Sequence, residues 1–205
     1  MLKLKYILND LVDYAYKGDP RLPAYKRFYV EYLKKRLKTK NGDYRAKDHR
    51  LRIFTEGRED IAIIKTSLHE MAHHILYTQR GILSHDASFY AVYKTLLYAA
   101  LDMGIFDKEA YSRCMKDSSD ANKVMKMLKD YKPKSTGYKE GIRRICVRNA
   151  FEIRGQLKKP GYIYNQYDKS WEKEVKSEDV KKEKDILHEL GAEYTINDAL
   201  QLTFS

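Results

Sequence analysis

Apolar positions recur at helical spacing along two neighbouring stretches in the middle of the chain, and they give its clearest structural prediction. The first stretch begins at Asp60 and ends at Gly81, and the second begins near residues 84–86 and ends at Gly104. A spacing of three and four residues places apolar side chains on one helix face, and Asp and Gly are typical of helix starts and ends. We therefore predict two amphipathic helices joined by a short loop. Their apolar faces comprise Ile61, Ile63, Ile64, Leu68, Met71, Ala72, Ile75 and Leu76 in the first helix and Phe89, Val92, Tyr93, Leu96, Leu97 and Ala100 in the second.

The sequence before these helices predicts further helices and a hairpin. One helix covers about residues 2–16, and another begins at Asp19-Pro20, a helix-start signal, and runs to about Leu37. A hairpin follows over residues 43–55, in which Leu51, Ile53 and Thr55 alternate with Arg50, Arg52 and Phe54. A small sheet is therefore expected to pack beside the helices.

A change of pattern at residues 133–137, which include Pro and Gly, predicts a linker. We therefore expect two domains, residues 1–132 and residues 138–205, and an α+β fold overall. Short helices complete the first domain, from Asp107 to about Lys116 and from Ser118 or Ser119 to about Tyr131. The second domain is predicted to be a small α+β module. Its elements are a strand at 142–147, a helix that Asn149 caps and that ends near Lys158, a hairpin of 162–165 and 170–175, a helix from Ser177 to Leu190, and a closing hairpin of 194–196 and 200–204.

The first amphipathic helix carries the pattern H-E-x-x-H, as His69, Glu70 and His73. Two His four residues apart lie about 40° apart around a helix and roughly 6 Å apart along it, so both can reach one metal ion. Glu70 points about 100° away from His69, where it can contact a water on the metal without competing as a ligand. The pattern is typical of a zinc site with a glutamate general base. The alternative is a solvated helix face that happens to carry His and Glu.

A catalytic zinc ion usually has three protein ligands and one open position, so a third ligand is expected. His85 follows the break at Gly81, and a residue at the start of the second helix can fold back onto the first. His74 points about 100° away from His73 and cannot share the metal face. Asp86 is the rival ligand, although it also suits a helix cap or a partner for an imidazole N–H.

The sequence from His69 to Phe89 resembles the SprT-like (Spartan-related) zinc metallopeptidases. Members of this family have H-E-x-x-H followed by a third His at the start of the next helix, with an aromatic residue just beyond, here His85 and Phe89. The resemblance covers residues 43 to about 103. The chain departs from the family pattern in having Asp86 where a Gly usually follows the third His, and it contains no Cys-rich zinc ribbon.

The resemblance implies a zincin-like, mainly helical metallopeptidase domain with a small edge sheet. The strand of residues 50–55 would then border the active-site cleft and pair with an extended substrate backbone. The expected activity is a zinc-dependent endopeptidase acting on protein. His69, His73 and His85 would hold Zn²⁺, and Glu70 would take a proton from the attacking water and deliver it to the leaving amine. His49, Arg50 and the many tyrosines are the alternatives for an oxyanion donor.

The net charge of +11 at pH 7 favours an anionic partner, with nucleic acid the first candidate. In the first domain the basic residues cluster at Lys34, Lys35, Arg36, Lys38 and Lys40. In the second they cluster at Arg143, Arg144, Arg148, Arg154, Lys158 and Lys159. Solvated helix faces in a lysine-rich chain are the alternative explanation.

Aromatic residues interleave with the second basic cluster, at Tyr162, Tyr164 and Trp171. Such residues beside Arg and Lys can stack on nucleic-acid bases, so we predict a DNA-binding role for them. The alternative is that alternate aromatic residues fill the core of a small sheet.

The remaining composition restricts the compartment. No apolar run is long enough to span a membrane, and the first ten residues lack the apolar core of a signal peptide. Cys114 and Cys146 form no C-x-x-C pair, which favours free thiols in a reducing cytoplasm.

The sequence leaves a second hypothesis beside the peptidase. In it the chain is a nucleic-acid-binding protein of a phage or mobile element, with a structural or regulatory zinc site.

Overall fold

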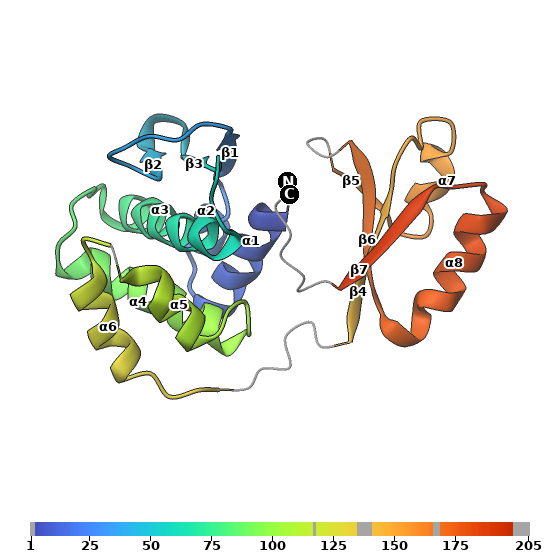
Figure 1. Cartoon of the computed structure of the whole chain (residues 1–205). Helices are drawn as coiled ribbons and strands as arrows, with labels where there is room; N and C mark the ends of the chain where they lie inside the picture. The colour runs from blue at the N-terminus through green and yellow to red at the C-terminus, as the bar shows by residue number, and fades with distance from the viewer. Residues whose placement is uncertain (1–2, 117, 135–140, 166–168, 199–205) are drawn as a thin grey trace. The chain divides into compact units, whose positions relative to one another are not determined.

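The computed structural model describes residues 3–116, 118–134, 141–165 and 169–198 (Figure 1). They form a mixed α+β structure, as the sequence predicted. The chain divides into two compact units, one of residues 3–136 and the other formed by the residues from 137 onward. No helix within the described ranges has both the length and the apolar character needed to cross a membrane.

The first unit is built around the long helix α3. The three-stranded sheet packs on one side of this helix, and α4 and α5 pack on the other (Figure 1). The helices of this unit are α1 (Lys3–Ala15), α2 (Leu22–Tyr25), α3 (Asp60–Arg80), α4 (Ala87–Asp102), α5 (Lys108–Met115) and α6 (Ala121–Lys129).

The two amphipathic helices predicted from the sequence are α3 and α4. Their apolar stripes form the centre of the core, where Leu68, Ile75, Leu96 and Leu97 are all fully buried. Gly81 ends α3 with φ of 69°, a left-handed conformation that Gly adopts without a steric penalty. The predictions for α1, α5 and α6 are also confirmed to within a few residues.

The predicted helix from Asp19 to Leu37 is wrong. Only α2 is helical there, and the chain then enters strand β1 (Tyr29–Leu33). Its residues are mostly aromatic or apolar, and Val30 is buried opposite Leu51 in the sheet. Strand pairing, which is a long-range interaction, therefore overrides the local helical periodicity.

This correction changes which strand lies at the edge. The sheet also contains β2 (Gly42–Arg45) and β3 (Arg50–Phe54), and its order is β1-β3-β2. Strand β1 pairs parallel to β3, and β2 pairs antiparallel to it. The strand expected at the edge, β3, is therefore central, and β1 and β2 take the two edge positions.

Strand β2 approaches helix α3 very closely at Gly42. A Cβ atom added to Gly42 would lie 2.6 Å from Thr66 Cγ2 and 2.7 Å from the backbone oxygen of Arg52. Contacts this short do not occur between real side chains, so a residue larger than Gly would push the strand away. Absence of a side chain at this position therefore sets the distance between the edge strand and the helix.

The second unit is an antiparallel sheet covered by two helices. Its strands are β4 (Ile142–Val147), β5 (Ile163–Asn165), β6 (Ser170–Lys176) and β7 (Tyr194–Asp198), in the order β5-β6-β4-β7. The helices are α7 (Arg154–Lys158) and α8 (Val180–Glu189), and α8 follows the 3-10 turn η2 (Ser177–Asp179). The core of this unit includes Ile145, Val147, Leu157, Tyr162, Trp171 and Leu187.

Two predictions for this unit need comment. Asn149 does not cap a helix, because it has φ of 51° and α7 begins only at Arg154. The expected closing hairpin is half described: Tyr194–Asp198 forms β7, which pairs with β4, whereas residues 200–204 lie outside the described part of the chain.

We expect Gly42→Ala to lower the free energy of unfolding of the first unit by about 1–3 kcal/mol, as overpacking in a core does. Gly155→Ala is the matched control, since nothing lies within 4 Å of a Cβ there and φ is not positive. That variant should leave the second unit unchanged or stabilise it by up to about 1 kcal/mol. Hydrogen exchange of peptides from α3 and β4 reads the two units separately. Equal protection of α3 in Gly42→Ala and the wild type would contradict the packing described here.

Candidate metal centre

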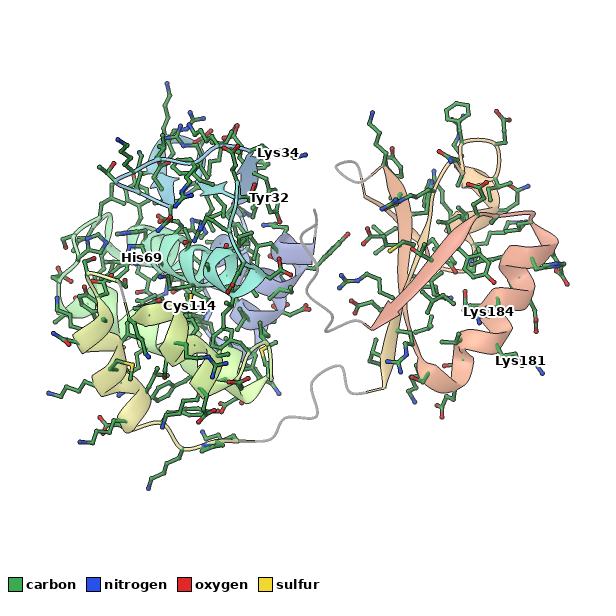
Figure 2. The ribbon with its side chains drawn as sticks, in the orientation of Figure 1. Tyr32, Lys34, His69, Cys114, Lys181 and Lys184 are labelled. Atoms are coloured by element: carbon green, nitrogen blue, oxygen red, sulfur yellow. The ribbon has the colours of Figure 1, made fainter. Side chains whose placement is uncertain are left out.

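Helix α3 and the loop before α4 bring three imidazoles together in one cluster. His69 and His73 lie one turn apart on α3, and His85 directly precedes Asp86, the N-cap of α4. The Nε2 atom of His85 lies 2.9 Å from the Nε2 atoms of both helix histidines. The ligand atoms of the three residues all lie within 4.8 Å of one another, so this cluster can hold a metal ion. Figure 2 labels His69 within the first unit.

The geometry of the cluster fits a small cation. A neutral imidazole presents one lone pair, and converging lone pairs repel one another unless a proton or cation lies between them. A tetrahedral ion such as zinc, with bonds of about 2.0–2.1 Å, needs nitrogen atoms about 3.4 Å apart, which small ring rotations provide. His85 is exposed and His69 is half-buried, so the cluster is open to solvent on one side.

The side chain of Phe89 packs against all three imidazoles. Its ring centroid lies 4.8 Å from that of His69, 4.5 Å from that of His73 and 4.7 Å from that of His85. Phe89 is fully buried in the first turn of α4. This ring therefore limits the orientations of the three histidines, which is the structural role of the aromatic residue after the third His.

Asp86 is a helix cap and does not join the cluster. Its Oδ1 accepts the backbone N–H of Ser88 at 2.8 Å and that of Phe89 at 3.2 Å, and its Oδ2 accepts the hydroxyl of Ser84. Capping of this kind holds the start of α4 in place. Of the two candidates for the third ligand, the structure therefore places His85 with the imidazoles and Asp86 beside them.

Burial keeps the imidazoles of the helix neutral. Desolvation, followed by the charge of His85, lowers the pKa of His69 to about 4. Desolvation and the charges of the other two imidazoles lower the pKa of His73 to about 3. A metal binds only the neutral form of imidazole, so both side chains are ready to act as ligands at neutral pH.

Glu70 is buried on the side of α3 that faces strand β2, and its exposed fraction is 6%. Desolvation and the nearby charge of Asp43 raise the pKa of this carboxyl group to about 8, although the backbone N–H of Tyr44 donates to it. A cation held by the neighbouring imidazoles would lower this pKa again, because an opposite charge favours the carboxylate. The group is thus poised to exchange a proton near neutral pH.

Glu70 and the three histidines line one cavity of about 540 Å³. Its lining includes the segment from Thr39 through strand β2 to Tyr44 and the segment from Ser118 to Asp120. Helix α3 also lines it, with Lys65 and Thr66 among its residues. The imidazoles therefore lie inside a cleft that is large enough to admit part of a polymer chain.

His74 points away from the cluster, as the helix geometry predicted. Its Nε2 lies 3.0 Å from the backbone oxygen of Tyr25, and its Nδ1 lies 3.2 Å from the hydroxyl of Tyr44. The same hydroxyl lies 2.8 Å from Nδ1 of His49. Tyr44 thus ties the edge strand to α3 through its side chain, while its backbone contacts Glu70.

Sequence reasoning missed the contributions of Tyr44 and Asp120. Asp120 Oδ2 lies 3.7 Å from Nδ1 of His69, and its Oδ1 accepts the hydroxyl of Tyr90 at 2.5 Å. Neither residue has a spacing that relates it to the H-E-x-x-H pattern, because each arrives from a different element of the fold. The one sequence signal for Tyr44 was its place in the predicted hairpin, which was expected to border the cleft.

The structure reduces the set of candidate oxyanion donors that the sequence left open. Arg50 forms ion pairs with Asp48 at 2.9 Å and Glu31 at 3.5 Å, and neither it nor His49 lines the cleft. The tyrosines that line the cleft are Tyr44, Tyr90 and Tyr93. Their hydroxyl groups contact, respectively, His49 and His74, Asp120, and Tyr111.

Three of the residues predicted to bind nucleic acid are buried. Arg144 has an exposed fraction of 2% and contacts Glu174 at 2.6 Å, and the hydroxyl of Tyr162 donates to Glu183 at 3.1 Å. Trp171 belongs to the core of the second unit. Buried side chains cannot stack on bases, so for Tyr162 and Trp171 the alternative of core packing holds and the prediction is corrected.

The other members of that predicted set reach the surface. Arg148, Lys158 and Lys159 are exposed, and Arg143 is partly exposed. Tyr164 has an exposed fraction of 49%, and its ring centroid lies 5.3 Å from that of Trp171 at the edge of the core. These residues stay a predicted nucleic-acid surface.

Compared with protein-family models, with curated proteins and with solved structures, the chain matches none of them. The geometry of the cluster and of the cleft around it is therefore what indicates a function.

We expect His85→Ala to lose most of the bound metal, whereas Asp86→Ala retains it. The reason is that the first variant removes a converging nitrogen, and the second removes only a helix cap, at a cost of about 1 kcal/mol. Metal content of both variants and the wild type, measured by elemental analysis after purification with added zinc, tests this expectation. Full metal content in His85→Ala together with loss from Asp86→Ala would reverse the assignment.

Proposed function

We propose that this protein is a zinc-dependent endopeptidase of the SprT-like type. The observation that carries the proposal is the convergence of His69, His73 and His85 in a cleft that also contains the buried carboxyl group of Glu70. Zinc prefers imidazole ligands, and three of them leave one position for water. When bound, the ion supplies a Lewis acid that activates a water molecule and polarises a carbonyl group.

Glu70 acts as the general base in this proposal. It lies beside His69 on α3, in the same cleft but on a different side of the helix, so it does not compete as a ligand. Its carboxylate takes a proton from the attacking water and delivers it to the leaving amine. The close approach of β2 at Gly42 and the N–H of Tyr44 keep this side chain in place.

Strand β2 supports a peptide as the substrate. It is an edge strand that pairs with β3 alone among the strands of the described sheet, and it forms one wall of the cleft. An extended peptide can add to such an edge through backbone hydrogen bonds, which would lay its carbonyl groups along the metal centre. This arrangement, with an edge strand above the motif helix, also supports a zincin-like domain.

We expect Glu70→Gln to retain zinc and the fold but to cleave a denatured protein such as casein about 10²–10⁴-fold more slowly, since it lacks the proton acceptor. Glu59→Gln is the matched control, because Glu59 is exposed at the start of the same helix and its side chain makes no capping bond. Cleavage and metal content are measured together. Undiminished proteolysis by Glu70→Gln would remove the mechanism, and chelation should abolish cleavage by the wild type.

The basic segment beside the cleft favours action on or near DNA. Every residue from Lys34 to Asn41 is exposed, and Lys40, which pairs with Asp43 at 2.6 Å, lines the cleft (Lys34 is labelled in Figure 2). Such a basic cluster binds the phosphate groups of DNA through their charge, without recognising the base sequence. The same segment supports the second candidate function, a DNA-binding protein of a phage or mobile element in which the metal is structural or regulatory. A reducing cytoplasm is the proposed compartment for either function.

We expect replacement of Lys34, Lys35 and Arg36 by Gln to weaken DNA binding and to reduce the slope of log K against log salt by about 2–3, because fewer counterions are released. The matched control replaces Lys181, Lys182 and Lys184, which are exposed on α8 (Figure 2), and should change the slope less. A salt-insensitive affinity would exclude phosphate-driven binding. Binding that survives chelation, without any cleavage in the presence of DNA, would favour the second candidate.

A further inference from the structure

The two ring nitrogens of His69 face different partners. Its Nε2 lies 2.9 Å from Nε2 of His85, inside the imidazole cluster. Its Nδ1 faces the other way, toward Oδ2 of Asp120 at 3.7 Å. Asp120 is therefore separated from the cluster by the imidazole ring and lies on the outer side of a candidate ligand, where it cannot itself be a fourth ligand without rearrangement.

The side chain of Asp120 is not occupied in capping its own helix. Asp120 stands at the N-cap of α6, a position where Asp usually accepts a backbone N–H, but it makes no such bond. In contrast, Asp86 and Asp107, at the starts of α4 and α5, both accept backbone N–H groups. The carboxylate of Asp120 is instead turned toward Tyr90, whose hydroxyl donates to it at 2.5 Å, and toward His69.

Contacts from two elements, the turn before α6 and helix α4, fix the position of the Asp120 carboxylate. The backbone N–H of Asp120 donates to the hydroxyl of Ser118 at 3.4 Å, which shapes the turn before α6. Tyr90 lies on α4, one residue after Phe89, and the ammonium group of Lys123 lies 4.1 Å from the centroid of its ring. Helices α4 and α6 thus hold one carboxylate next to the outer nitrogen of His69.

His73 lacks an equivalent partner. Its Nδ1 is buried and has no hydrogen-bond partner among the described residues. A carboxylate beside one ring nitrogen favours the tautomer that carries its proton there, and so leaves the lone pair on the opposite nitrogen. Of the two helix ligands, His69 is therefore the one whose tautomer and orientation a neighbouring side chain can set.

We propose that Asp120 is a positioning residue that orients His69 and keeps its Nε2 lone pair directed into the metal site, with Tyr90 holding the carboxylate. The inference rests on the proposed metal centre and adds a residue from α6 to it. Outer carboxylate partners of this kind typically contribute about 10–100-fold to metal affinity. Tyr90 contributes through the carboxylate, so its effect is smaller.

The test compares the affinities of Asp120→Ala, Asp120→Asn, Tyr90→Phe and wild-type full-length protein for Zn²⁺ and Co²⁺ by chelator competition. We expect Asp120→Ala to bind about 10–100-fold more weakly. Asp120→Asn should lose less, because its amide oxygen still presents an acceptor toward the N–H, and Tyr90→Phe should lose least. The ring ¹⁵N resonances of His69 should show a single Nδ1–H tautomer in the wild type and a mixture in Asp120→Ala.

Asp107→Ala is the matched control, because it removes a helix-capping carboxylate from the preceding helix without touching the cluster. It should change thermal stability but not metal affinity. Affinities of Asp120→Ala within twofold of the wild type, or an unchanged His69 tautomer, would overturn the inference. The more conservative Asp120→Asn decides the question where Asp120→Ala unfolds. A wild type that binds no zinc would instead overturn the proposed function, so the two failures are distinguishable.

Discussion

The close packing of strand β2 on helix α3 is the contact on which the cleft depends. Gly42 allows the strand backbone to approach the helix at Thr66, where even a methyl group would not fit. This approach buries Glu70 and places the N–H of Tyr44 next to its carboxyl group. One small residue therefore links the sheet edge, the buried carboxyl group of Glu70 and the wall of the cleft.

Electrostatics in the cleft follow from the same burial. Desolvation disfavours the charged forms of both kinds of side chain, so the pKa of Glu70 rises to about 8 and those of His69 and His73 fall to about 4 and 3. These opposite shifts leave a neutral carboxylic acid beside neutral imidazoles. A cation bound by the imidazoles would restore the carboxylate, so metal binding and base strength are coupled through one low-dielectric environment.

Much of the candidate metal site followed from the sequence, because the residues that form it are close together in the chain. His69, Glu70 and His73 share one helix whose periodicity is strong, and His85 comes just before the next helix. Long-range contacts were not predictable in the same way. The sequence predicts a helix over β1, because its pairing with β3 leaves no local signal, and the wrong placement of β3 at the edge follows from that error. Asp120 lies 51 residues beyond His69 in the numbering, and only the packing of α6 on α4 brings it there.

Charge and aromatic patterns were a poor guide to which side chains are exposed. Arg144 counted as a surface cation in the sequence, yet its strand buries it beside Glu174. Tyr162 and Trp171 counted as stacking residues, yet a sheet of this size needs its aromatic residues for its own core. Composition fixes how many cations a chain has, whereas only the fold decides which of them a partner can reach.

The apolar core of the first unit supports the proposed catalytic role of a bound metal over a purely structural one. Structural zinc sites stabilise small domains that lack enough apolar surface to fold without the ion. Here Leu68, Ile75, Leu96 and Leu97 join α3 to α4 in a fully buried core, and Phe89 aligns the imidazoles from within it. The cluster is therefore built on helices that share an apolar core of their own. Such a partly exposed set of three candidate ligands suits the proposed catalytic ion, because one coordination position would stay open to water and substrate.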